Sequence, residues 1–246
     1  MKKAIVVGGS SGIGLALALS LKDYCEVYIV DRQKFTPPRE MLSGGTRYHA
    51  VSFDLLSEDY SLFEQFADAD TLIITAGVGR LALFGDTREE EIDRSFRVNT
   101  IGPMRIIRHF YRKISASDDD FYCVVMASIS GHISSPFFSI YSATKAALHR
   151  FVESVNIELE KAGAKNRILE VSPGTIKGTN FYGGGNDLTQ TLPLAGEILQ
   201  RMYDRETLYI PQYDEVFGDV IARYRSDPHR FGLESYEYKQ NSGRMK

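Results

Sequence analysis

Short runs of apolar, largely β-branched residues alternate along the chain with longer stretches in which apolar residues recur every three or four positions. The short runs predict strands at 3–7, 26–30, 47–53, 71–75, 121–127, 167–172 and 207–210. Their nearly continuous apolar character is typical of strands that are buried on both faces of a parallel sheet. The periodic stretches predict helices at 12–22, 57–67, 88–114, 139–162 and 194–204, with 214–225 as a further option.

This alternation predicts an α/β fold in one domain over 1–246, a doubly wound parallel sheet of about seven strands with helices on both faces. The glycines and Pro193 within 177–193 predict an irregular loop between a late strand and a helix. Such a loop often covers the ligand crevice of an open parallel sheet. We therefore expect a substrate lid near 177–204, with a plain surface connection as the alternative, and a C-terminal extension over 212–246.

Net charge and cysteine positions argue against several classes of function. A formal net charge of −3 argues against nucleic acid as a partner, and the chain has no long uncharged apolar run that predicts a membrane span. Cys25 and Cys123 lie far apart and lack a Cys-x-x-Cys pattern, so we expect free thiols in a cytoplasmic protein. We expect no metal site, and interpret the acidic run 118–120 as a solvated turn.

A glycine-rich turn, Gly8-Gly9-Ser10-Ser11-Gly12-Ile13-Gly14, joins the first predicted strand to the first predicted helix. Glycines there allow positive φ and let a pyrophosphate approach the main-chain N–H groups at a helix N-terminus. A turn of this kind also packs a helix on a strand without any ligand. Taken alone, it leaves both interpretations open.

Asp31 closes the second predicted strand about 20 residues after the glycines, where a carboxylate can accept both ribose hydroxyls of a dinucleotide. The same carboxylate would repel a 2′-phosphate, which favours NAD(H) over NADP(H). Arg32 works against this preference, because its guanidinium could stack on adenine or hold a phosphate. We therefore expect NAD(H) as the preferred cofactor, with NADP(H) as the alternative.

Tyr141 and Lys145 stand four residues apart in a predicted helix, so their side chains share one face. A nearby ammonium favours the phenolate and lowers the pKa of a tyrosine from about 10, which suits a general acid/base. Ser128 ends a predicted strand, where its hydroxyl could hold a substrate oxygen. Taken singly, the Tyr–Lys pair could be a surface pair and the serine a strand cap.

Asn99 lies on an apolar stripe of the helix predicted over 88–114, between Phe96 and Pro103. The stripe places its amide in the interior, where an amide needs hydrogen-bond partners. Two interpretations stay open. Asn99 is either a structural hydrogen-bonder or a residue that holds a water and relays protons from Lys145 to solvent.

Together, the glycine turn, Asp31, Asn99, Ser128, Tyr141 and Lys145 resemble the classical short-chain dehydrogenase/reductase family over roughly residues 3–180. The resemblance implies a Rossmann sheet and hydride transfer between nicotinamide and a small carbonyl or alcohol substrate. It makes Tyr141 the general acid/base, with Lys145 lowering its pKa and holding the nicotinamide ribose. It makes Ser128 the residue that orients the substrate oxygen, and Asn99 the anchor of the proton relay.

The same resemblance implies a cofactor site and a homodimer or homotetramer. The residues implied for the cofactor site are Gly8, Ser10, Ser11, Gly12, Ile13, Gly14, Asp31, Arg32, Asp54, Leu55, Ala76, Gly77, Tyr141, Lys145, Pro173, Gly174, Ile176 and Thr179. Asp54 and Leu55 would meet the adenine, and the segment that begins at Pro173 would contact the nicotinamide carboxamide.

Some residues depart from the family pattern. Val7 stands where Thr is usual and Thr75 where Asn is usual, so two hydrogen bonds at the glycine turn are expected to differ. Thr179 follows Gly178, the position where many members carry the threonine that contacts the cofactor, and the usual glycine-rich C-terminal ending is missing.

Two other functions remain as alternatives. One is a catalytically weak NAD(H)-binding regulatory or scaffold protein. The other is an isomerase or epimerase, although relatives of that kind usually have a longer C-terminal substrate domain. Four aromatic residues, Phe137, Phe138, Phe181 and Tyr182, flank the expected crevice and suggest an apolar or ring-bearing substrate, unless they are core packing.

Overall fold

Seven parallel strands form the centre of the computed structural model, which describes residues 2–33, 35–36, 45–179, 181 and 185–242. The strands are β1 (Lys3–Val7), β2 (Glu26–Asp31), β3 (Arg47–Ser52), β4 (Thr71–Ile74), β5 (Tyr122–Met126), β6 (Ile168–Val171) and β7 (Leu208–Tyr209). They pair in the order β3-β2-β1-β4-β5-β6-β7. The predicted parallel sheet is confirmed, and every strand bound lies within one residue of its expected position.

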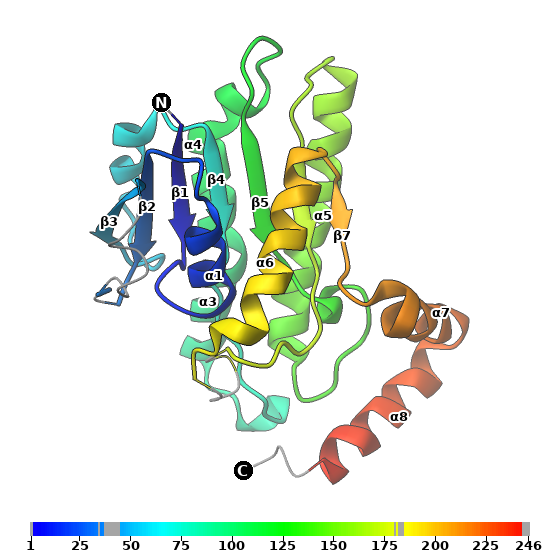
Figure 1. The fold of residues 1–246 in the computed structure, drawn as a ribbon. Coiled ribbons are helices and arrows are strands. Elements are labelled where there is room, and N and C mark those ends of the chain that lie inside the picture. The colour runs from blue at the N-terminus through cyan, green and yellow to red at the C-terminus, as the bar shows by residue number, and fades with distance from the viewer. Residues whose placement is uncertain (1, 34, 37–44, 180, 182–184, 243–246) are drawn as a thin grey trace.

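Helices cover both faces of this sheet (Figure 1). On one face, α1 (Gly12–Ser20) packs beside α6 (Leu188–Tyr203), and on the other lie α4 (Gly102–Ile114) and α5 (Ser139–Lys161). Alternate residues of each strand point to opposite faces, so Ala4 and Val6 enter the first core while Ile5 and Val7 enter the second. The predicted doubly wound fold is therefore confirmed.

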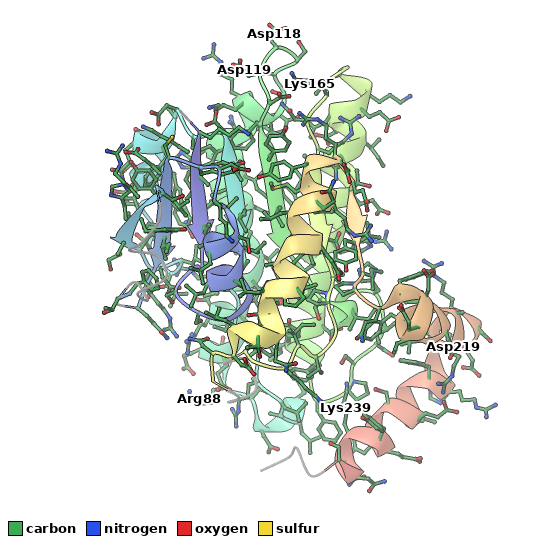
Figure 2. All side chains as sticks on the ribbon, viewed as in Figure 1. Arg88, Asp118, Asp119, Lys165, Asp219 and Lys239 are labelled. Carbon is green, nitrogen blue, oxygen red and sulfur yellow. The ribbon has the colours of Figure 1, made fainter. Side chains whose placement is uncertain are left out.

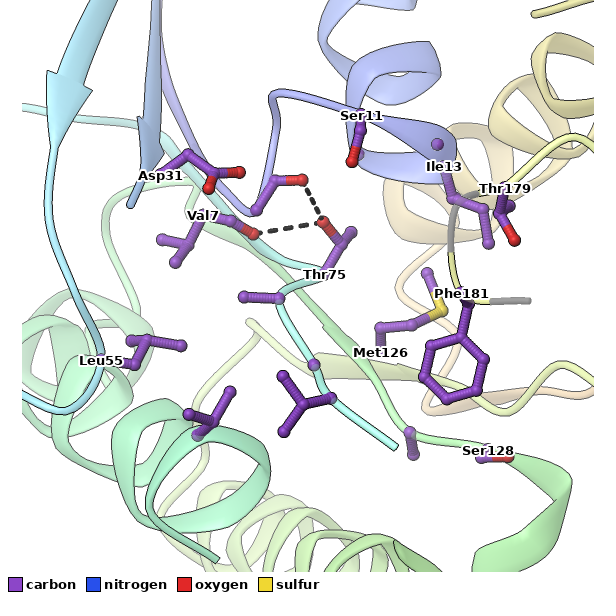
Figure 3. Close-up of a pocket in the computed structure, with 18 of the residues that line it drawn as sticks. Val7, Ser11, Ile13, Asp31, Leu55, Thr75, Met126, Ser128, Thr179 and Phe181 are labelled. Atoms are coloured by element: carbon purple, nitrogen blue, oxygen red, sulfur yellow. Dashed lines mark hydrogen bonds between the residues drawn. The ribbon is translucent and has the colours of Figure 1, made fainter. Parts of the chain in front are cut away.

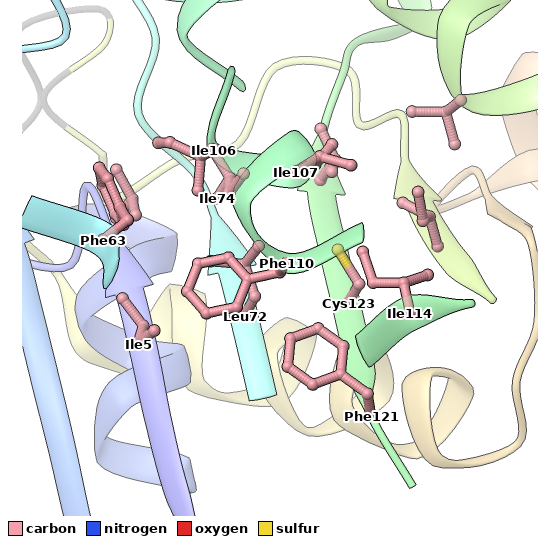
Figure 4. Close-up of a cluster of buried hydrophobic side chains, with 14 of the residues drawn as sticks. Ile5, Phe63, Leu72, Ile74, Ile106, Ile107, Phe110, Ile114, Phe121 and Cys123 are labelled. Atoms are coloured by element: carbon pink, nitrogen blue, oxygen red, sulfur yellow. The ribbon is translucent and has the colours of Figure 1, made fainter. Parts of the chain in front are cut away.

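The second core is rich in aromatic rings (Figure 4). Phe110 of α4 stacks on Phe121 with ring centres 5.8 Å apart, beside the fully buried strand residues Ile5 and Leu72. Cys123 is buried in the same cluster, and this burial raises the pKa of its thiol. Both cysteines are free, as expected.

The helix predicted over 88–114 is one helical stretch with a local irregularity. It consists of α3 (Glu89–Phe96), the π-helical turn η3 (Arg97–Ile101) and α4. The predicted interior position of Asn99 is confirmed, because its exposed fraction is 0%. The π-turn, which the three- and four-residue spacing did not reveal, encloses this asparagine, and π-turns often mark functional positions.

The helix predicted over 57–67 is wrong in extent. Only the 3₁₀ helix η1 (Ser61–Phe66) forms there. Upstream, side chains bind the backbone locally: Asp54 accepts from the N–H of Leu56 at 2.9 Å, and Asp59 accepts from the N–H of Ser61 at 2.8 Å. These short-range bonds compete with helical ones and delay the helix.

The loop predicted up to residue 193 is also wrong in its last part, because α6 begins at Leu188. The carboxylate of Asp187 caps this helix by accepting from the N–H of Thr189 at 3.0 Å. Pro193 lies inside the helix and costs it one backbone hydrogen bond without ending it.

The C-terminal region is helical. The optional helix at 214–225 is present as the π-turn η6 (Tyr213–Phe217) and α7 (Gly218–Ser226). An unpredicted helix, α8 (Pro228–Asn241), follows and lies away from the sheet (Figure 1). The sequence did carry its start signal, since Asp227 caps the helix by accepting from the N–H of Arg230 at 2.9 Å and Pro228 occupies its first turn.

Two expectations about composition can be compared with this fold. Among the described residues, no helix combines the length and the apolar character that a bilayer crossing requires. Asp118 and Asp119 lie at an exposed loop tip (Figure 2). Asp120 pairs with Lys165 at 3.1 Å and Arg205 at 2.6 Å, as expected for a solvated turn.

Asn156 should matter for stability because it fastens α5 to β6. Its Nδ2 donates to the carbonyl of Ile168 at 2.8 Å, and its Oδ1 accepts from the N–H of Ile168 at 2.9 Å. Asn156→Ala leaves both buried groups unpaired, so we expect the free energy of unfolding in urea to fall by about 2–4 kcal/mol. Glu158→Ala, an exposed site on the same helix, should change it by less than about 0.5 kcal/mol. Equal effects of the two substitutions would contradict this role.

Candidate functional site

The strand order places a crevice between β1 and β4. The chain leaves these neighbours in opposite directions, so the loops after their carboxyl ends diverge and open the sheet edge. A cavity of about 420 Å³ lies at this position, with Asp31 near one end, Ser128 near the other and Thr75 between them (Figure 3).

All predicted site residues except Asn99 line this one cavity. From the cofactor set these are Gly8, Ser10, Ser11, Gly12, Ile13, Gly14, Asp31, Arg32, Asp54, Leu55, Ala76, Gly77, Pro173, Gly174, Ile176 and Thr179. Ser128, Tyr141 and Lys145 line it as well. Residues that lie more than 100 positions apart in the sequence therefore face the same space.

The glycine turn requires its glycines. Gly8 has a φ of +83° and Gly12 a φ of +55°, a region that residues with a Cβ rarely adopt. A Cβ on Gly14 would collide with the carbonyl oxygen of Gly8 and with the Thr75 hydroxyl. The turn can therefore hold its backbone N–H groups close to the cavity and to the N-terminus of α1.

Thr75 and Ser10 hold the two sides of this turn. The Thr75 hydroxyl lies 3.2 Å from the carbonyl oxygen of Val7 and 3.1 Å from that of Gly8, and donates to this pair (Figure 3). The Ser10 hydroxyl donates to Oδ2 of Asp31 at 2.6 Å. Although Thr75 stands where Asn is usual, its hydroxyl still donates a hydrogen bond from the end of β4 to the glycine turn.

Lys145 lies on the first turns of α5 with an exposed fraction of 2%. Its Nζ donates to the carbonyl of Met126, the last residue of β5, at 2.7 Å. The same Nζ lies 5.7 Å from the centre of the Tyr141 ring. Burial lowers the pKa of Lys145 to about 8, and the carboxylate of Glu170 opposes this shift. The lysine is therefore close enough to influence the charge of the phenol.

Ser128 follows β5 and begins the 3₁₀ turn η4 (Ile129–Gly131). Its Oγ accepts from the N–H of Ser130 at 3.2 Å and lies 3.5 Å from the carbonyl oxygen of Pro173. The serine does cap a turn, as one interpretation expected. It also lines the cavity with Tyr141 and Lys145, so both interpretations apply.

Both the oxygen and the nitrogen of the Asn99 side-chain amide form hydrogen bonds within the protein. Its Oδ1 accepts from the N–H of Val78 at 2.8 Å, and its Nδ2 donates to the carbonyl of Val78 at 2.8 Å and to Oγ1 of Thr144 at 3.0 Å. These bonds connect the segment after β4 to the residue before Lys145. A water relay through Asn99 stays a prediction.

A second cavity of about 360 Å³ lies next to Tyr141. Phe181, whose ring centre is 5.3 Å from that of Tyr141, lines both cavities, and so does Arg94 of α3. Arg94 was not among the predicted site residues, because one exposed arginine on an amphipathic helix gives no distinctive pattern. Phe137 lines the second cavity, and Phe138 is buried with its ring centre 5.5 Å from that of Tyr141.

The C-terminal helix α8 braces the wall of this second cavity. Nζ of Lys239 donates to Oγ of Ser135 at 2.6 Å and to the carbonyl of Pro136 at 2.9 Å. Tyr236 stacks on Phe137 with ring centres 4.6 Å apart. Phe137 has a φ of +64°, a conformation that costs energy for a residue with a Cβ and needs support from its surroundings.

The predicted lid is described only in part, because positions 180 and 182–184, Tyr182 included, lie outside the described residues. The described portion meets the glycine turn. The N–H of Gly12 donates to Oδ1 of Asn186 at 2.8 Å, and Thr179 lies where a Cβ on Gly12 would touch its side chain at 3.5 Å. Thr179 thus lines the cavity despite its shifted position.

A parallel sheet in this order, with a glycine turn at the point where strand order reverses, defines a Rossmann-type dinucleotide-binding fold. The family model of the short chain dehydrogenases matches residues 2–186, about three quarters of the chain. The protein belongs to this family of oxidoreductases, the classical short-chain dehydrogenases/reductases.

Individual relatives agree with this assignment. A fungal protein from Zymoseptoria tritici, described as a probable tetrahydroxynaphthalene reductase, is 30% identical over 193 residues, which cover 74% of this chain and 70% of the relative. A short-chain dehydrogenase from Sphingobium yanoikuyae in complex with NADPH has a TM-score of 0.75 at 24% identity, with 96% of each chain covered. One from Burkholderia phymatum in complex with NAD has a TM-score of 0.77 at 18% identity, covering 92% of this chain and 93% of that one. The two structures show the fold.

Thr75 can be tested by removing only its hydroxyl. Thr75→Val keeps the side-chain shape but loses the donor to the glycine turn, so we expect a loss of about 1–2 kcal/mol in the free energy of unfolding, measured in urea. Thr75→Ser keeps the donor and should lose less. If the valine variant is as stable as the serine variant, the hydroxyl does not hold the turn.

Proposed function

We propose that this protein is an NAD(P)(H)-dependent oxidoreductase that transfers a hydride between nicotinamide and a small carbonyl or alcohol, with Tyr141 as the general acid/base. One observation carries the proposal: Ser128, Tyr141 and Lys145 line the same cavity as the glycine turn and Asp31. A catalytic group and a nucleotide-binding turn that share a cavity can act on one reaction.

The cavity suits a dinucleotide. Asp31 lies at the end of β2, where it would accept the adenosine ribose hydroxyls, and the N–H groups of the turn would meet the pyrophosphate. Asp54 and Leu55 would meet the adenine, while the segment from Pro173 to Ile176 would meet the nicotinamide. When bound, the cofactor would supply or accept the hydride.

The protein's own residues would move the proton. The Tyr141 hydroxyl would donate to the carbonyl oxygen during reduction and accept the alcohol proton during oxidation. The buried Lys145 ammonium favours the phenolate that remains after donation, because opposite charges attract strongly where water is scarce. The Ser128 hydroxyl would hold the same substrate oxygen in place.

The second cavity would take the substrate. Phe137 and Phe181 give it aromatic walls, and Arg80, Glu91 and Arg94 add charged groups. The aromatic walls favour an apolar or ring-bearing carbonyl or alcohol, and the charged groups would meet its polar substituents. The fungal relative carries the name of a ring compound, a tetrahydroxynaphthalene, which agrees with this class.

The proposed cofactor is NAD(H) in preference to NADP(H), because the carboxylate of Asp31 would repel a 2′-phosphate. Arg32 also lines the cavity and keeps NADP(H) as the alternative. The single domain over 1–246, the lid, the homodimer or homotetramer and the cytoplasmic location stay predictions from the sequence.

Two departures from the family pattern leave room for a regulatory or scaffold protein: Thr75 and the C-terminal extension over 212–246. Thr75 donates a hydrogen bond to the glycine turn, and α8 braces the wall beside Tyr141. Because both features support the site, neither one favours a protein that has lost catalysis.

Tyr141→Phe removes the proposed acid/base and little else. We expect turnover to fall by about 100-fold or more, while NADH still binds, because general acid–base catalysis contributes on that scale. NADH consumption with a panel of ketones, aldehydes and quinones, and NAD reduction with alcohols, measure the rates. Tyr238→Phe, at a tyrosine that is 66% exposed on α8, is the matched control and should turn over like the wild type. A Tyr141→Phe enzyme of wild-type rate would remove Tyr141 from the reaction.

Asp31→Ala tests the nucleotide preference. We expect the ratio of kcat/KM for NADH to that for NADPH to fall by about 10-fold or more, because 10-fold corresponds to about 1.4 kcal/mol and two like charges about 4 Å apart near a protein surface repel by about 4 kcal/mol. Asp23→Ala, at an exposed aspartate outside the cavity, should leave the ratio unchanged. An unchanged ratio in the Asp31 variant would mean that the carboxylate does not select the cofactor.

A further inference from the structure

Three residues outside the predicted site lie close together, beside the segments that carry Ser128, Lys145 and Pro173. His132 follows η4, His149 lies on α5 and Glu170 lies in β6. Nδ1 of His149 is 2.8 Å from Oε2 of Glu170, and Nε2 of His132 is 3.3 Å from Oε1. One potential ligand atom from each residue fits within a 4.8 Å limit for all pairs.

The cluster is largely buried and separate from the two cavities. The side chains of His132, His149 and Glu170 are 9%, 12% and 3% exposed, and none of them lines either cavity. Ser172 extends the cluster, since its Oγ donates to Oε1 of Glu170 at 2.7 Å and lies 2.9 Å from Nε2 of His132. Four side chains therefore direct nitrogen or oxygen atoms to one place.

We propose that His132, His149 and Glu170 form a binding site for one zinc-type divalent cation, with the Ser172 hydroxyl or a water as the fourth ligand. Two imidazoles and one carboxylate are a ligand set that zinc prefers, whereas magnesium and calcium prefer oxygen ligands alone. The partly exposed histidines offer the cation a path from solvent.

The observed spacing suits such an ion. Two ligands at about 2.0–2.1 Å from zinc and at the tetrahedral angle lie about 3.4 Å apart. Of the nitrogen-to-oxygen separations in the cluster, 3.3 Å is close to this value, and 2.8 Å is a hydrogen-bond length that falls below it. A single cation between the three side chains would replace the protons of these bonds, and its ligand atoms would have to move apart by up to about 0.6 Å.

The position of the cluster indicates what the ion would do. Ser128 lies four residues before His132, Lys145 lies one helical turn before His149, and Pro173 lies three residues after Glu170. The ion would thus join the three segments that carry the proposed catalytic and nicotinamide-facing residues. Because the cluster does not line either cavity, the main role of the ion would be to fix these segments, and it would also offset the Glu170 carboxylate that favours the Lys145 charge.

The test uses the full-length protein after dialysis against a chelator, with Zn²⁺ and Co²⁺ alone as probes. We expect one equivalent of Zn²⁺ to bind in calorimetry and to raise the thermal midpoint. We expect Co²⁺ to give the visible absorption of a tetrahedral site. His149→Gln and Glu170→Gln should each weaken Zn²⁺ binding by about 100-fold or more, since even an outer-shell loss typically costs about 10- to 100-fold.

His229→Gln, at an exposed histidine on α8, is the matched control and should bind like the wild type. Should the cluster variants fail to fold, X-ray absorption of the Zn²⁺-loaded wild type still decides, because the proposal requires scattering from two imidazoles. Binding that is substoichiometric, that lacks two imidazole ligands, or that His229→Gln reduces as much as the cluster variants do, would overturn the proposal. The cluster would then be a hydrogen-bonded network only.

Discussion

A buried ammonium is the constraint on which the site depends. Lys145 is 2% exposed, and a charge at that depth is costly unless polar groups surround it. The carbonyl of Met126, the last residue of β5, accepts its hydrogen bond, and the carboxylate of Glu170 in β6 favours its charge. The lysine therefore fixes α5 against the carboxyl ends of two central strands. Tyr141, one turn earlier on α5, is brought to the cavity by the same contact.

The rest of the site is arranged around this position by backbone constraints. Gly8 and Gly12 supply positive φ at the turn after β1, and Gly14 leaves room for the carbonyl of Gly8. The amide of Asn99 fastens the segment after β4 to Thr144, next to Lys145. Specific hydrogen bonds from Thr75 and Asn99 thus hold the loops after β1 and β4, and both loops line the cavity.

Much of this arrangement could be predicted from the sequence, because buried parallel strands leave a strong local signal. The continuous apolar runs around Val6 and Ile73 are typical of strands buried on both faces of a sheet. A parallel sheet brings the carboxyl ends of its strands to one edge. The inward position of Asn99 followed from helical spacing. Family resemblance supplied the roles that spacing alone could not assign.

The errors arose where local side-chain chemistry outweighs the hydrophobic pattern. Asp54 and Asp59 bind nearby backbone N–H groups and shorten the helix before Phe66, while the cap at Asp187 starts α6 ahead of Pro193. These signals lie in single polar residues, which a search for periodicity overlooks.

The His132, His149 and Glu170 cluster was beyond prediction for another reason. Its members come from a turn, a helix and a strand, and only the packing of α5 on β6 brings them together. Arg94 and the braced Phe137 are similar cases, since the fold and not the local sequence gives them their position.

A crystal structure of the protein grown with NADH tests the central claim most directly. The account predicts the pyrophosphate against the turn between Gly8 and Gly14, the nicotinamide beside Tyr141, and the Lys145 ammonium near both the phenol and the ribose. A dinucleotide bound elsewhere, or a Tyr141 hydroxyl directed away from the nicotinamide, would contradict it.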